Sequence, residues 1–410
     1  MSVTPGSWRV FAGAVMTVVL ACIVAGTAEA QEAPKPPAQA PPKPPPPTIV
    51  WRDGKTRITL ENAYLEISNR VQFRFTEELP DEDTQLPGTG DAGDQRGSFR
   101  IRRAKFKLEG WILRPWLTYE TQVNYPAVTG SNPGALLEDA AFDVDFSKGK
   151  GLVRIHAGQF KVPFGAQELT SSGNQMFVDR ALVSNSFFRG RDAGVALWGA
   201  TPNNRIEWRV GLFNGNGLTR TANDNDKYQY NARIMWQPNG SQSLNQRAWV
   251  SGPLYSESDF ESTKTPIYAI AFNWENQNNF NATTGNDQKW NAISLDGIYK
   301  FKGFSVNGMY AFAHRTPETG AEFDAAGGFI QAGKLFATRK YEVAIRYGSF
   351  DPTDRTSRNV TREVRGAFNY YYARHGLKWQ TDFGPVHVQA GPTSPTMRTV
   401  EVRSQLQFIF

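Results

Sequence analysis

One stretch of the sequence, residues 158–195, brings cations together with aromatic and glycine residues; it reads GQFKVPFGAQELTSSGNQMFVDRALVSNSFFRGRDAGV. The cations of this stretch are Lys161, Arg180, Arg189 and Arg191. Fixed cations in a narrow, partly desolvated passage attract anions far more strongly than cations in bulk water do. The stretch therefore predicts a site that attracts anions. Asp179 and Asp192 stand beside two of the arginines, so structural ion pairs are the competing interpretation.

The same stretch begins like the end of one β-strand and finishes like the start of the next. A connection of this length inside a compact fold is uncommon and usually functional. Gly165 and Gly173 permit sharp turns of the backbone, and Phe177, Phe187 and Phe188 offer apolar anchors. We therefore expect a loop that folds back onto the elements around it and narrows the space between them.

The sequence patterns of common catalytic and metal sites are absent. The four histidines are isolated, and there is no H-E-x-x-H, G-x-S-x-G or Walker A motif. The run NDND at residues 223–226 lacks the remaining spaced ligands of a calcium loop. We expect no enzymatic activity, no catalytic residue, no metal site and no cofactor.

Amphipathic β-strands dominate the chain after residue 50. In the C-terminal TVEVRSQLQFIF, apolar Val400, Val402, Leu406 and Phe408 share one parity, and polar residues occupy the other. Such alternation is typical of a strand with one wet and one apolar face. A soluble β-sandwich or β-helix would turn the apolar face inward, whereas a membrane β-barrel turns it toward lipid and places the charges in an aqueous lumen.

The lengths of the connections distinguish these two architectures. Tight turns such as residues 114–115, 302–303 and 338–339 alternate with long loops such as residues 76–97 and 214–226. Short turns at one end and long loops at the other are typical of bacterial outer-membrane barrels. We therefore predict an all-β fold, a transmembrane antiparallel β-barrel of about 16 strands.

In this barrel, residues 400–410 should pair with a strand near residues 57–75 to close the wall, and residues 158–195 should form an inward-folded constriction loop. Residues 238–266 depart from the pattern, because a short turn is expected there. Either they form a large periplasmic turn or they contain a further hairpin.

A second group of cations lies on the strand expected at FRIRRAKFKLEGWI, residues 99–112. Arg103, Lys105 and Lys107 share one face, opposite apolar neighbours. Arg100 and Arg102 have the other parity, so this strand requires a β-bulge near its start or a position beyond the membrane. Arg103, Lys105 and Lys107 are therefore expected to add to the positive field of the lumen.

The N-terminal segment predicts export. Arg9 precedes a long apolar run that ends in Ala28-Glu29-Ala30, which predicts a secretory signal peptide over residues 1–30. A retained membrane anchor and a lipoprotein signal at Cys22, the only cysteine, are the alternatives. Residues 31–50 are rich in proline and predict a stiff periplasmic linker, or else a ligand for a proline-recognising partner or the cell wall. The barrel then occupies residues 51–410.

The charges of the chain are spread along it. The net charge is only +6, and no helix or loop concentrates it, so we expect no nucleic-acid partner. The acidic loop DEDTQLPGTGDAGD, residues 81–94, is either an ordinary solvated loop or a contact with divalent cations that bridge lipopolysaccharide. Outer-membrane lipid and lipopolysaccharide are therefore the expected surroundings.

Two segments resemble the phosphate-selective porin O/P family. FRIRRAKFKLEGWI is similar to the arginine-rich second strand of that family, and AGQFKVPFGAQELTSS, FVDRALV and FRGRDAGV are similar to its inward-folded loop. The resemblance implies a homotrimer of barrels in the bacterial outer membrane, each with its own pore. It does not establish phosphate as the solute.

The expected function is a passive channel for small solutes, selective for anions such as phosphate or polyphosphate. The expected constriction residues are Lys161, Arg180, Arg189 and Arg191 of the loop with Arg103, Lys105 and Lys107 of the strand. A general diffusion porin of other selectivity and a structural or adhesive barrel remain as alternatives.

Overall fold

The computed structural model describes residues 46–410 except 53, 130–131, 188–189, 219–221, 224, 240–251, 263, 281–286, 318, 337 and 395. The predicted signal peptide and most of the proline-rich segment lie outside the described residues. In the described part, no helix is long and apolar enough to cross a membrane.

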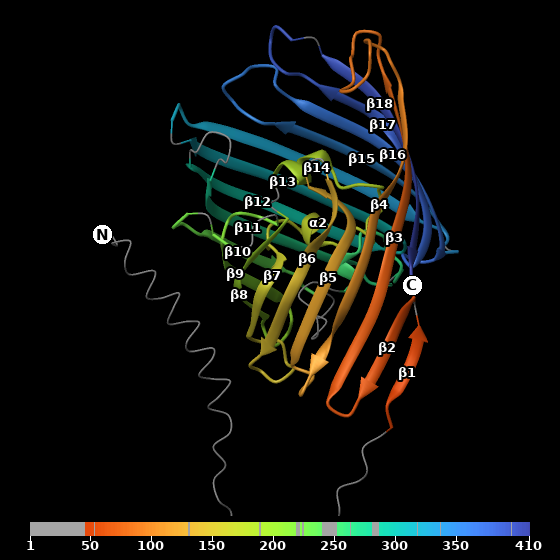
Figure 1. Cartoon of the computed structure of the whole chain (residues 1–410), viewed down its shortest axis with the longest axis vertical. Helices are drawn as coiled ribbons and strands as arrows, with labels where there is room; N and C mark the ends of the chain where they lie inside the picture. The colour runs from red at the N-terminus through yellow and green to blue at the C-terminus, as the bar shows by residue number, and fades with distance from the viewer. Residues whose placement is uncertain are drawn as a thin grey trace, which may run out of the picture. The chain divides into compact units, whose positions relative to one another are not determined.

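Antiparallel strands make up most of the described chain (Figure 1). Their bounds are β1 Thr48–Arg52, β2 Lys55–Leu60, β3 Ala63–Pro80, β4 Arg96–Ile112, β5 Leu117–Thr129, β6 Asn132–Asp145, β7 Arg154–Lys161, β8 Arg191–Ala200, β9 Ile206–Phe213, β10 Gln229–Trp236, β11 Ile267–Phe280, β12 Asp287–Phe301, β13 Phe304–Pro317, β14 Phe323–Leu335, β15 Tyr341–Asp351, β16 Thr361–Ala373, β17 Leu377–Val388 and β18 Met397–Ile409.

The wall closes into a barrel because β18 pairs with β3, with Ile409 opposite Arg70 and Thr399 opposite Pro80. Each strand from β3 to β18 pairs with the next, which gives a closed antiparallel barrel of 16 strands, as the sequence predicted. Figure 1 shows the two closing strands side by side. The first predicted strand, near residues 57–75, is divided into β2 and β3 by a tight turn.

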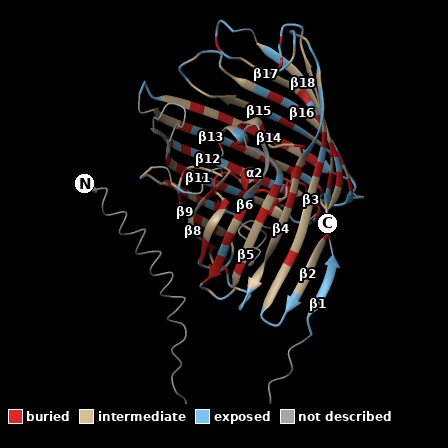
Figure 2. Cartoon of the chain, viewed as in Figure 1, coloured by how far each residue is buried: buried red, intermediate tan, exposed pale blue. Residues whose placement is uncertain are grey.

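The inner and outer faces of the wall alternate as expected for a membrane barrel. On β15, Ile345 is 61% exposed while the next residue, Arg346, is completely buried. On β18, Phe408 is 42% exposed while Gln407 is completely buried. Figure 2 shows this alternation along the strands. The apolar side chains therefore face outward toward lipid, and the polar ones face the lumen.

The connections differ between the two ends of the barrel. One end carries tight turns such as the one between β12 and β13. We assign this end to the periplasm, because short turns lie there in outer-membrane barrels. Residues 237–266, between β10 and β11, are a large turn at this end, and their described part contains a short 3-10 helix, η2 (Pro253–Tyr255), and no strand. Of the two interpretations of this stretch, the large turn is therefore correct for its described residues.

Candidate functional site

The long connection between β7 and β8, here called the constriction loop (residues 162–190), folds into the barrel (Figure 1). The amide of Val162 donates a hydrogen bond to the carbonyl oxygen of Gly190 at 3.0 Å, which closes the base of the loop. Two short helices lie between, α2 (Ala166–Leu169) and α3 (Leu182–Phe187). Gly165 precedes α2 with a φ of 80°, a conformation that favours glycine.

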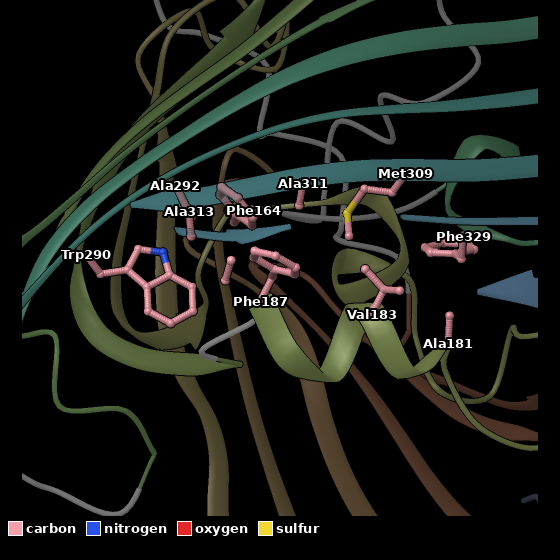
Figure 3. Close-up of a cluster of buried hydrophobic side chains, with 11 residues drawn as sticks. Phe164, Ala181, Val183, Phe187, Trp290, Ala292, Met309, Ala311, Ala313 and Phe329 are labelled. Atoms are coloured by element: carbon pink, nitrogen blue, oxygen red, sulfur yellow. The ribbon is translucent and has the colours of Figure 1, made fainter. Parts of the chain in front are cut away.

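Apolar side chains dock the loop against the inner face of strands β12–β15. Phe187 of α3 meets Trp290 of β12 and Phe350 of β15 edge to face, with ring centroids 6.2 and 5.5 Å apart. The other members of this cluster from the loop are Phe164, Ala181 and Val183, and those from β12–β14 are Ala292, Met309, Ala311, Ala313, Ala325 and Phe329 (Figure 3). Because four of the wall residues in this cluster are alanines, α3 can approach the wall closely.

Polar side chains of the wall satisfy the backbone of the loop. A loop inside the lumen has no strand partner for its amides, and buried amides need acceptors. Val178 donates its amide to Asp382 Oδ2 at 2.9 Å, and Leu182 donates to Glu363 Oε1 at 2.9 Å. Phe177 lies beneath the guanidinium of Arg346, 4.0 Å from its carbon to the ring centroid. The loop is thus fixed by both apolar and polar contacts.

A cavity of about 680 Å³ lies between the constriction loop and the inner face of strands β2–β7. Many of its lining side chains are charged, with ten lysines and arginines against six aspartates and glutamates. The cavity is therefore a polar passage with an excess of positive charge.

A β-bulge turns two adjacent arginines into this passage. The register of β3 and β4 shifts so that Gln72 pairs with Arg103 while Phe73 pairs with Ile101. Arg102 is the extra residue, and both Arg102 and Arg103 line the cavity. The bulge predicted from the parity of the strand is confirmed. Arg100 lies opposite Arg74 on the same inner face.

An arginine cluster, consisting of Arg74, Arg102, Arg103 and Arg403, surrounds one carboxylate of the loop, Asp179. Arg74 forms an ion pair with it, while the nearest nitrogens of Arg103 and Arg102 lie 3.6 and 3.8 Å from its oxygens. Burial alone would raise the pKa of Asp179, but Arg74, Arg103 and Arg102 hold that pKa well below its usual range. Asp179 therefore remains an anion among cations that outnumber it.

Three other cations of the cavity, in contrast to the arginine cluster, are balanced by carboxylates. Arg191 makes a bidentate pair with Asp139, with both nitrogen–oxygen distances at 2.8 Å, and Lys105 pairs with Glu138. Lys107 pairs with Glu109 at 2.8 Å and Glu120 at 3.0 Å. We call these groups the paired network. A second bulge, at Glu138, turns both Glu138 and Asp139 inward.

Two further predicted cations hold the loop together. Lys161 Nζ donates to the carbonyl oxygens of residues 168, 169 and 170 at 2.6 to 3.1 Å. Arg180 donates to the carbonyl oxygens of residues 167, 168 and 170 and pairs with Glu168 at 3.1 Å. Both side chains still line the cavity.

The structure thus brings six of the predicted residues to one cavity: Lys161, Arg180, Arg191, Arg103, Lys105 and Lys107. Arg189 and Phe188 lie outside the described residues. Sequence reasoning missed Arg70, Arg74 and Arg403 as site residues. The polar parity of β3, where arginines alternate with Val71, Phe73 and Phe75, was the signal that could have found the first two.

Comparisons with known proteins agree with this description. The family model of phosphate-selective porin O and P matches residues 80–410. A curated uncharacterized protein of Aquifex aeolicus is 23% identical over 253 residues, which span 55% of this chain and 57% of that protein.

Solved structures share the fold at low sequence identity. An anion-selective porin from Comamonas acidovorans is 12% identical, with a TM-score of 0.58, covering 85% of this chain and all of that one. The outer-membrane channel DcaP of Acinetobacter baumannii is 10% identical, with a TM-score of 0.57, covering 86% of this chain and 99% of that one.

Proposed function

We propose, from the premise that the chain belongs to the phosphate-selective porin O and P family, that its passive outer-membrane channel selects small anions. The family and the barrel establish the channel and its membrane. The selectivity and the identity of the solute are the proposed part.

The arginine cluster is the observation that carries the proposal. Arg74 forms an ion pair with Asp179, and Arg403 is bidentate to Asp382 at 2.7 and 2.9 Å. Among the described residues, Arg102 and Arg103 meet a carboxylate only at the longer distances to the same Asp179. Fixed guanidinium groups in a confined passage raise the local concentration of anions and exclude cations. A phosphate-like anion can also accept two hydrogen bonds from one guanidinium.

The remaining constriction residues have a supporting role in this proposal. Arg191, Lys105 and Lys107 are neutralised by neighbouring carboxylates, so they shape the passage and contribute less to its net field. Lys161 and Arg180 fix the loop from within. Arg189, which is predicted to line the constriction, stays part of the proposal.

The sign of the reversal potential in a salt gradient tests anion selectivity. In planar bilayers with a potassium chloride gradient, we expect the sign of the reversal potential to show that chloride permeates about ten-fold better than potassium. Inorganic phosphate added to the same bath should reduce the chloride current if it occupies the arginine cluster. A reversal potential near zero would favour a general diffusion porin, because a lining whose cations are all neutralised by carboxylates would not select between anions and cations. A preference for potassium would contradict the proposal.

Assembly and export are further parts of the proposal. We infer that the barrels form homotrimers in outer-membrane lipid and lipopolysaccharide, and that residues 1–30 are removed on export. N-terminal sequencing of the purified protein should then begin at Gln31. A start at Met1, or a monomer in native mass measurements, would contradict these inferences.

A further inference from the structure

The large periplasmic turn between β10 and β11 also enters the barrel, from the end opposite the constriction loop. Its described residues 252–262, here called the inner turn, include Tyr255, Glu257 and Asp259, which are at most 3% exposed. Burial of polar residues on a turn is unusual, because turns usually lie on the surface and buried polar groups need partners. The inner turn is therefore buried inside the barrel, where its polar groups need partners.

The wall of the barrel holds the inner turn from several strands. Lys300 of β12 donates from Nζ to the carbonyl oxygen of Ser258 at 3.0 Å, and the amide of Gly303 donates to Asp259 Oδ2 at 2.7 Å. The hydroxyl of Tyr255 donates to Glu207 of β9 at 2.9 Å. These contacts fix the turn independently of the constriction loop.

Glu257 joins this fixed turn to the constriction loop. Gln167 Nε2 donates to Glu257 Oε1 at 2.9 Å, and the amide of Met176 donates to Glu257 Oε2 at 2.8 Å. The amide of Glu257 itself donates to the carbonyl oxygen of Asn174 at 3.0 Å. One buried carboxylate thus uses both oxygens on the loop, and hydrogen bonds to a charged group are the stronger ones.

Gln167, which binds Glu257, also forms hydrogen bonds with the second half of the constriction loop. Its Oε1 accepts the amide of Ala181 at 3.0 Å and also the hydroxyl of Ser184 at the start of α3. Its carbonyl oxygen accepts Arg180 Nε at 3.1 Å. Helix α2, which carries Gln167, has only four residues and cannot hold its own shape. Its position must come from such contacts.

We propose that the inner turn braces the constriction loop from the periplasmic side, and that Glu257 is a positioning residue that, together with the apolar anchor of the loop, sets the bore of the pore. This inference rests on the proposed function only for its effect on current. The position of the loop itself can be measured without any current.

A single-cysteine reporter measures that position. Cys22 is the only cysteine of the sequence and falls in the predicted signal peptide, so Ser171→Cys introduces the sole thiol of the exported barrel, at a residue that lines the cavity. In this background, Glu257→Gln removes one of the two acceptor oxygens. We expect the thiol to react about ten-fold faster with a charged methanethiosulfonate reagent, because loss of one charged hydrogen bond loosens the loop by about that factor.

The matched control is Glu261→Gln, which makes the same charge change on the same turn at an exposed residue. Its labelling rate and single-channel conductance should equal those of the parent. The swap Glu257→Gln with Gln167→Glu should restore slow labelling, because the amide introduced at position 257 can accept from Met176 and donate to the carboxylate introduced at position 167. Labelling and conductance of Glu257→Gln equal to those of the control would overturn the proposal.

Folding is checked by the heat-modifiable shift of the barrel on gels. If Glu257→Gln fails to fold, the swap decides: a folded swap with slow labelling supports the proposal, and an unfolded swap overturns it. If the parent conducts no ions but the labelling follows the expected order, the channel function fails while the brace stands.

Discussion

Two parts of the barrel wall differ in the side chains that they turn inward, although apolar outward and inward residues alternate along the strands of both. On the packed wall, strands β11–β16, many inward residues are alanines, such as Ala271, Ala292 and Ala311. On the open wall, strands β3–β6, the inward residues are long and charged, such as Arg103 and Lys105. Small inward side chains thus leave room for the constriction loop on the packed wall, while long charged side chains line the cavity on the open wall.

The charges of the lumen follow the same division. Glu363 of the packed wall and Asp382 of the neighbouring strand β17 accept hydrogen bonds from loop amides. Carboxylates of the open wall are used to neutralise cations, except around Asp179, where cations are in excess. The selectivity of the channel should therefore depend on the open wall, and its bore on the packed wall.

Loss of the apolar anchor should have the largest effect. Phe187→Ala leaves a cavity against the packed wall and should weaken loop docking by about 3–5 kcal/mol. We expect single-channel conductance to rise about two-fold or more, with larger current noise, because the loop then leaves its docked position. Phe312→Ala deletes the same ring from the lipid-facing side of β13 and is the control. Equal conductance in both variants would show that the packed wall does not set the bore.

Opposite substitutions in one ion pair should move selectivity in opposite directions. Arg191→Gln removes the bidentate partner of Asp139 and the second cation beside Glu138. It should lower the anion preference, at a stability cost of about 3–5 kcal/mol. Asp139→Asn frees Arg191 and should raise the anion preference. Reversal potentials in a salt gradient measure both. Shifts of the same sign in the two variants would contradict the assignment of this pair to the passage.

Asp179→Asn should have a smaller effect than either. It removes the negative charge of the carboxylate that the four guanidinium groups of the arginine cluster surround, so the anion preference should rise. The rise should be about two-fold or less, because the constriction loop also loses its ion pair with Arg74. The measurement is again the reversal potential. A lower anion preference in this variant would show that Asp179 holds the arginines in place more than it neutralises them.

Acidification should not reproduce Asp179→Asn. The pKa of Asp179 lies well below its usual range, so its interaction with the arginines persists as the pH falls through the ordinary aspartate value of about 3.9 and is lost only below the lowered pKa. We expect the loop to stay docked at about pH 4. Labelling of the Ser171→Cys reporter at this pH with a reagent active in acid is the check, and fast labelling would contradict it.

Parity along the strands, together with the alternation of short and long connections, was sufficient to predict the barrel, its number of strands and its closure, because a period of two residues recurs in most strands. A bulge reverses the parity within one strand. The reversal between Arg102 and Arg103 indicated a bulge, whereas the reversal at Glu138-Asp139 was not recognised. The ion pairs of Arg191 and Lys105 depend on this second bulge and were therefore missed.

The inner turn could not be predicted for a different reason. Its partners, among them Lys300, Tyr371 and Gln167, are spread over the whole chain, and nothing in residues 252–262 repeats with the period of a strand. The length of the connection was the only signal available from the sequence. That length marked residues 238–266 as unusual, but the position of the turn inside the barrel depends on tertiary contacts that the sequence does not show.

The reversal potential of two matched double variants tests the central claim most directly. Arg102→Gln with Arg103→Gln removes two cations that share one carboxylate, 3.6 to 3.8 Å away. Lys105→Gln with Lys107→Gln removes two cations of the same strand that each have carboxylate partners of their own. We predict that the first double variant loses most of the anion preference and that the second loses less of it, with both barrels folded. Loss of selectivity in the second variant with no change in the first would contradict the account.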